Sequence, residues 1–153
     1  MIVKIRQFFE QHIITIETDT DDRLEQRLQQ ACAALMIEVI YADHKVEAEE
    51  LDALRRVIQY SFGLSLVETD ELIELADQER REATDYFQFT TLINEHYSQQ
   101  QKRELVTRLW QLAFANDNVH KLEEHLIRRL ADLLHVPHTA FMQSKHQAMT
   151  NNT

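Results

Sequence analysis

The chain has 153 residues with a single Gly and a single Pro, and 26 acidic against 16 basic residues give it a formal net charge of −10. Phosphate-binding loops, dinucleotide fingerprints and nucleophile elbows need glycine where the backbone turns sharply or approaches a ligand, so these sites are excluded. The negative charge disfavours nucleic acid and anionic membranes as main partners, because both repel an acidic protein.

The predicted elements, in chain order, are a short N-terminal helix and then seven further helices. Their apolar residues recur with helical spacing, most clearly in the stripe from Leu122 to Leu134. An N-cap oxygen with an acceptor three residues later marks starts at Asp22, Ser65 and Ser98, and Pro137 suits a first helical turn. The predicted spans are 2–14, 22–42, 47–61, 66–82, 85–96, 99–115, 121–134 and 138–148.

This pattern predicts an all-α fold, a single compact bundle of seven to eight helices. Residues 1–149 are predicted to form one domain and residues 150–153 a disordered tail. The lone cysteine, Cys32, lies in an apolar helix, which indicates a reducing compartment and a small buried side chain rather than a nucleophile. The N-terminus lacks the apolar run of a signal peptide, and the most apolar stretch, 31–42, is too short to span a bilayer. We therefore expect a cytoplasmic protein that is not inserted in a membrane.

The sequence also repeats itself at a constant offset. The run ADHKVEAEELDALRR, which begins at Ala42, aligns with ANDNVHKLEEHLIRR, which begins at Ala115, and an aromatic residue precedes each run. Each copy covers the end of a long helix, a short polar turn and the start of a second helix. The repeat therefore predicts two related helical hairpins that pack on each other within one bundle.

These hairpins resemble the TerB family of bacterial tellurite-resistance proteins, whose pattern Ala-Asp-Gly-x-Val/Ile-x-x-x-Glu occurs at the turn of each of two hairpins. The run 85–142 is similar to the stand-alone TerB-like branch, so the resemblance covers nearly the whole chain. It implies a helical module linked to tellurite or general stress response, related to the N-terminal domain of membrane-anchored J-domain co-chaperones. The chain departs from the pattern where His44 and Asp117 replace the family glycine and Asn116 replaces the second aspartate.

The two turns carry oxygen donors that are candidate ligands for a divalent cation: Asp43, Glu50, Asn116, Asp117 and Glu123. A structural interpretation stays open beside this one, because Glu50 and Glu123 are also placed to accept hydrogen bonds at the N-termini of their helices. Neither turn is an EF-hand, because both lack its glycine and its order of ligands. If the turns follow the family geometry, His44 and Asp117 adopt positive φ.

Other clusters of polar residues favour structural roles. His120 and His125 are five residues apart, which places their side chains about 140° apart on a helix and excludes a zincin motif. The remaining clusters are interpreted as an acidic helix start, exposed or core-edge histidines, and helix flanks that pair with acidic residues: Asp19, Asp21 and Asp22; His135, His138 and His146; and the doublets Arg55–Arg56, Arg80–Arg81 and Arg128–Arg129.

The sequence thus favours a non-enzymatic interaction module without catalytic residues. Its partner is an unidentified protein or a second copy of the chain in a homodimer, and a divalent cation is its one candidate cofactor. Two alternatives remain: a structural adaptor that binds no metal, and a metal-dependent hydrolase that uses two of the many carboxylates. Calorimetry with Ca²⁺, Mg²⁺, Mn²⁺ and Zn²⁺ separates a cation-binding protein from a metal-free adaptor.

Overall fold

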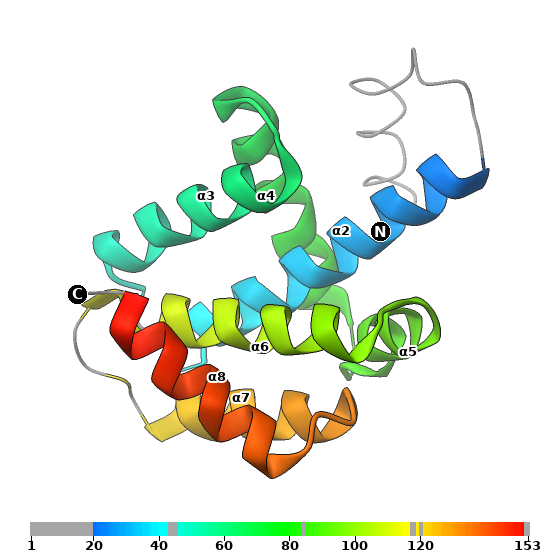
Figure 1. The fold of residues 1–153 in the computed structure, drawn as a ribbon. Helices are drawn as coiled ribbons and strands as arrows, with labels where there is room; N and C mark the ends of the chain where they lie inside the picture. The colour runs from blue at the N-terminus through cyan, green and yellow to red at the C-terminus, as the bar shows by residue number, and fades with distance from the viewer. Residues whose placement is uncertain (1–19, 43–45, 84, 117–118, 120, 152–153) are drawn as a thin grey trace.

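The computed structural model describes residues 20–42, 46–83, 85–116, 119 and 121–151, and within these ranges every regular element is a helix (Figure 1). The prediction of an all-α fold is confirmed. The predicted helix at 2–14 lies outside the described residues. The elements are α2 (Thr20–Ile40), α3 (Ala48–Phe62), α4 (Leu66–Glu82), α5 (Phe87–His96), α6 (Gln99–Ala113), a 3-10 turn η1 (Phe114–Asn116), α7 (Lys121–Leu133) and α8 (His138–Asn151).

Two helices, α2 and α6, form the centre of the bundle and pack against each other. Helix α2 also contacts α3, α4, α5 and α7, and α6 also contacts α3, α7 and α8. From Ala31 to Ile40 every side chain of α2 except Glu38 is buried. A helix that is apolar on all sides is stable in water only when other helices surround it. Figure 1 shows α3 and α4 on one side of the crossing of α2 and α6, and α7 and α8 on the other.

The predicted caps explain where two of the helices begin. The Ser65 hydroxyl accepts a hydrogen bond from the Glu68 N–H at 3.1 Å, and the Glu68 carboxylate accepts one from the Ser65 N–H at 2.9 Å. Ser98 and Gln101 form the same reciprocal pair ahead of α6. The prediction of a cap at Asp22 is wrong, because α2 begins at Thr20 and Asp22 lies inside its first turn. An acidic residue in the first turn of a helix is favourable too, because the N-terminus of a helix is the positive end of its dipole.

The end of α7 has a left-handed residue that the sequence did not indicate. His44 and Asp117, where positive φ was predicted, lie outside the described residues; His135 has φ of 59°. The N–H of His135 bonds to Asp132 O, and the N–H of Val136 bonds to Ala131 O. This is a Schellman motif, in which glycine is the usual residue at the left-handed position. His135 therefore ends α7 with a left-handed residue, as Gly63, with φ of 66°, ends α3.

We expect His135→Gly to raise the free energy of unfolding by about 0.5 kcal/mol, since glycine removes the Cβ strain but loses more backbone entropy on folding. His135→Val is expected to lower it by more than about 1 kcal/mol, because a β-branched residue is poorly accommodated at positive φ. Gly63→Ala is the matched control: a Cβ there meets no atom within 4 Å, so it reports the backbone strain alone. Urea unfolding followed by circular dichroism measures all three, and an unchanged midpoint for His135→Val would contradict the assignment.

Candidate functional site

The two hairpins that carry the sequence repeat correspond to α2–α3 and to α6–η1–α7. The two hairpins pack on each other. The 3-10 turn η1, at the turn of the second hairpin, contacts α3, and α2 contacts α7. Of the five predicted cation ligands, Asp43 and Asp117 lie outside the described residues, and Asn116 ends η1. Glu50 and Glu123 are each the third residue of the second helix of their hairpin.

Glu50 and Glu123 are both withdrawn from solvent, with relative exposures of 0% and 1%. One oxygen of Glu50 accepts a hydrogen bond from the Glu47 N–H at 3.1 Å. This hydrogen bond confirms the prediction that Glu50 reaches back to the start of its own helix. The matching burial of the two side chains was not foreseen, because a carboxylate at a turn is usually exposed. The available sequence signal for this matching burial was the equivalent position of Glu50 and Glu123 in the two copies of the repeat.

No three His, Cys, Asp or Glu side chains form a metal-binding group within the part of the chain that the structure describes. The histidines at the C-terminal end do not converge on one another as ligands there: His135, His138 and His146 are all exposed, and the ring of His138 lies against Phe141. This agrees with their interpretation as surface or core-edge residues.

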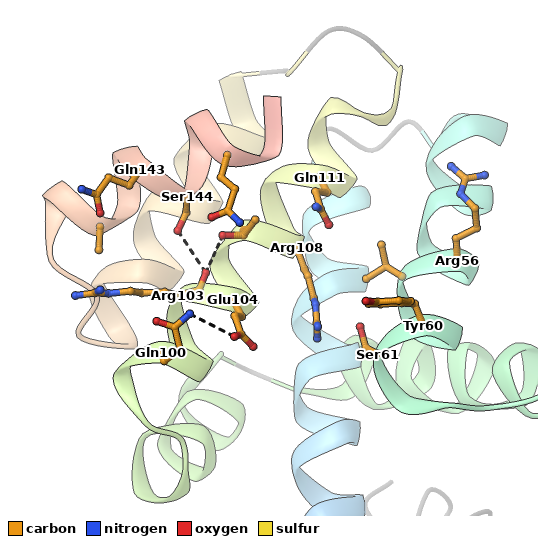
Figure 2. Close-up of a pocket in the computed structure, with 14 residues that line it drawn as sticks. Arg56, Tyr60, Ser61, Gln100, Arg103, Glu104, Arg108, Gln111, Gln143 and Ser144 are labelled. Atoms are coloured by element: carbon orange, nitrogen blue, oxygen red, sulfur yellow. Dashed lines mark hydrogen bonds between the residues drawn. The ribbon is translucent and has the colours of Figure 1, made fainter. Parts of the chain in front are cut away.

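A polar cavity of about 600 Å³ lies between α3, α6 and α8 (Figure 2). Helix α6 forms its floor, since its lining residues follow the spacing of one helix face, while α3 and α8 form its walls. We call this cavity the arginine groove. Its lining residues are Arg56, Val57, Tyr60 and Ser61 of α3, Gln100, Arg103, Glu104, Thr107, Arg108 and Gln111 of α6, and Ala140, Gln143, Ser144 and Gln147 of α8.

A hydrogen bond links the floor of the groove to its wall where α8 packs on α6. The main-chain oxygen of Arg103 accepts hydrogen bonds from the Thr107 hydroxyl at 2.9 Å and from the Ser144 hydroxyl at 3.3 Å. The Ser144 bond joins α8 to α6, and both hydroxyl-bearing residues are buried. The Ser144 hydrogen bond therefore links the α8 wall to the α6 floor at Arg103, whose side chain is exposed.

Three arginines line this groove, Arg56, Arg103 and Arg108, together with a single acidic residue, Glu104. Within the described ranges none of the three forms an ion pair, whereas Arg55 pairs with Asp52 and Asp70. The prediction that the arginine doublets pair with acidic residues is thus confirmed for Arg55, and likewise for Arg80 and Arg81 with Asp77. Sequence reasoning did not single out Arg103 and Arg108, although the polar face of the 99–115 helix was the available signal.

A smaller cavity of about 200 Å³ adjoins the groove and shares Ser61, Glu104 and Arg108 with it. Cys32 lies in its wall, and its sulfur is 3.4 Å from the Tyr97 hydroxyl oxygen. Burial raises the pKa of the Cys32 thiol to about 11, which keeps it protonated at neutral pH. Cys32 is therefore a buried, unreactive side chain, as predicted.

The comparisons with known proteins agree with this architecture. A crystal structure of a protein of unknown function from Porphyromonas gingivalis W83 is similar in fold, with a TM-score of 0.60 and 17% sequence identity over 81% of this chain and 94% of that one. No curated protein matches the sequence. Within the described residues no helix is both long and apolar enough to cross a membrane. The family profile of tellurite resistance protein TerB matches residues 29–146, which include both copies of the repeat and every lining residue of the arginine groove except Gln147, and the chain therefore belongs to the TerB family.

Proposed function

We propose that this chain is a non-enzymatic interaction module that acts in the response to tellurite or to general stress and that holds its partner in the arginine groove. The observation that carries this proposal is the set of arginines in the groove without carboxylate partners in the described chain. A guanidinium in a protein with ten excess negative charges has many acidic side chains available to it, and within the described residues Arg56, Arg103 and Arg108 form no ion pair with any of them. Such groups are available to a ligand.

The chemistry of the groove favours binding over catalysis. The side chains that line it are mainly guanidinium, amide and hydroxyl groups, which hold a ligand by charge and hydrogen bonds. Nucleophilic or general acid–base catalysis needs a reactive group beside a second group that activates it. The described residues that line the groove include one carboxylate, Glu104, and it accepts a hydrogen bond from the Gln100 amide at 3.3 Å.

Photo-crosslinking in the native cell tests this proposal. Benzoylphenylalanine in place of Tyr60, which lines the groove and is 87% exposed, is expected to give covalent adducts with a partner. The same group in place of Phe87, which is 60% exposed on α5, is the control and is expected to give none. An adduct of twice the mass of the chain would identify a homodimer. Equal adducts at both positions, or none at position 60, would refute the placement of the partner.

The role in stress is tested separately by survival. Cells that lack this gene are expected to lose resistance to tellurite or to another stress, and the wild-type gene is expected to restore it. A gene carrying Arg103→Gln and Arg108→Gln is expected to fail, because the partner is no longer held. Full rescue by this double variant would show that the groove has no part in the response.

Cation binding at the hairpin turns is a second proposed function, supported by the matching burial of Glu50 and Glu123. Carboxylate oxygens are the ligands that hard divalent cations prefer, and the repeat places these two carboxylates at equivalent positions of the two hairpins. The proposed ligands are those predicted from the sequence: Asp43, Glu50, Asn116, Asp117 and Glu123. Helix α3, which carries Glu50, contacts η1, which ends at Asn116, so residues of both hairpins meet here.

We expect millimolar Ca²⁺ or Mg²⁺ to raise the melting temperature, since a ligand that binds only the folded chain stabilises it. Glu123→Gln keeps the shape of the side chain and removes its charge, and is expected to abolish the shift. Glu95→Gln changes an exposed carboxylate on α5 and serves as the control. A shift of equal size in all three proteins, or no shift in the wild type, would leave Glu50 and Glu123 with a structural role.

A further inference from the structure

We infer that the arginine groove binds an acidic peptide segment of a protein partner, whose carboxylates pair with Arg56, Arg103 and Arg108. This inference rests on the proposed function, which puts the partner in the groove, and adds the chemistry of that partner. It follows from three features of the groove: its charge, the spread of that charge, and the amide side chains in its α8 wall.

The charge of the groove is opposite to that of the rest of the molecule. Three arginines and one glutamate line it, in a chain with 26 acidic and 16 basic residues. The Glu104 carboxylate accepts a hydrogen bond from the Gln100 amide and, within the described residues, forms no ion pair with the three arginines. A guanidinium binds a carboxylate through two parallel hydrogen bonds, which makes carboxylates well matched ligands for these side chains. The acidic remainder of the surface repels long polyanions, so a short acidic segment fits better than nucleic acid.

The positive charges are spread across the groove rather than gathered at one point. Arg103 and Arg108 are five residues apart on α6, which separates them by about 7.5 Å along the axis and about 140° around it. Figure 2 shows Arg103 on the side of α8 and Arg108 directed toward Tyr60 and Ser61 of α3. Arg56 comes from α3 itself. One compact anion therefore meets one arginine at a time, whereas successive carboxylates along a peptide can meet several.

Amide side chains in the α8 wall of the groove suit a peptide backbone. Gln143 and Gln147 of α8 are exposed in the wall, and each offers both a donor and an acceptor. Such groups pair with the N–H and C=O of an extended chain. The ring of Tyr60 stands almost fully exposed at the α3 side and offers apolar contact to side chains between the acidic ones. Recognition of acidic segments by arginine clusters is a recurring mode of peptide binding.

The test uses fluorescence anisotropy of a labelled peptide of about twelve residues in which glutamates alternate with alanines and leucines. The wild-type protein is expected to bind it, and the variant with Arg103→Gln and Arg108→Gln is expected to bind at least about tenfold more weakly, since each charged hydrogen bond contributes on that order. A variant with Arg23→Gln and Arg27→Gln, which loses the same charge from exposed positions on α2, is the matched control and should retain its affinity. Raising the salt concentration is expected to weaken the binding.

Several outcomes would overturn the inference. The first is that a peptide with glutamine in place of every glutamate binds as tightly as the acidic peptide. The second is that both double variants lose the same amount of affinity, and the third is that the wild-type protein does not bind the acidic peptide. Displacement of the peptide by inorganic phosphate, where sodium chloride of the same ionic strength has no effect, would identify a phosphate site instead. Adducts at position 60 with a segment that is not acidic would refute this inference and leave the interaction module standing. Absence of those adducts would refute the proposed function itself.

Discussion

Trp110→Ala is expected to lower the free energy of unfolding by about 3–5 kcal/mol, the range for removal of a large buried aromatic side chain. Trp110 is fully buried on α6, and its ring lies 5.8 Å from the ring of Phe114 and 5.3 Å from that of Phe141, between centroids. The Lys145 ammonium is 5.1 Å from its centroid. The indole therefore joins α6 to η1 and α8, and its loss leaves a cavity where these elements meet. Urea unfolding followed by circular dichroism measures the effect.

Trp110→Phe is the informative control for this substitution. The indole N–H of Trp110 is buried and has no hydrogen-bond acceptor in the described part of the chain. Phenylalanine keeps most of the ring contacts and removes this buried donor, so we expect it to cost only about 1–2 kcal/mol. A loss as large as that of Trp110→Ala would show that the N–H contributes more than the packing does.

Arg80→Met is expected to lower the free energy of unfolding by about 3 kcal/mol, because it leaves the poorly solvated Glu38 carboxylate without the guanidinium it pairs with and leaves Asp77, within the described residues, paired only with the exposed Arg81. The guanidinium lies 2.6 Å from Asp77 Oδ1 and 3.3 Å from Glu38 Oε1, and it stacks 4.5 Å above the Tyr41 ring. All three charged side chains are at most 17% exposed. These contacts join α4 to the C-terminal end of α2, beside the turn of the first hairpin.

Arg55→Met is the matched control, since Arg55 also has two carboxylate partners, Asp52 and Asp70, but is 42% exposed. We expect it to cost less than about 1 kcal/mol, because water solvates and screens this pair. Arg80→Lys is expected to fall between the two, since it keeps the charge and loses the planar fork. Equal losses for Arg55→Met and Arg80→Met in the same urea titration would mean that burial does not set the value of these pairs.

The features that the sequence alone determined depend on interactions between residues that are close together in the chain. The reciprocal caps of Ser65 with Glu68 and Ser98 with Gln101 involve groups three residues apart, so the helix starts at 66 and 99 were predictable. The apolar stretch 31–42 was recognisable as part of a helix, and its lone thiol, Cys32, was recognised as a buried side chain. The TerB pattern at the two turns was likewise readable, because it lies within short stretches of chain.

Tertiary structure decided what depends on distant segments meeting. The arginine groove needs α3, α6 and α8 side by side, and no local pattern states which exposed face of α6 becomes its floor. The burial of Glu50 and Glu123 depends on how each hairpin packs against the other. The left-handed residue at His135 was also hidden, because Val136 must reach back to Ala131 as it enters the core, and this overrides the preference of histidine. The positions of the helices depend on interactions between residues a few positions apart in the chain. The surfaces between helices depend on contacts between distant segments, which exist only in the folded chain.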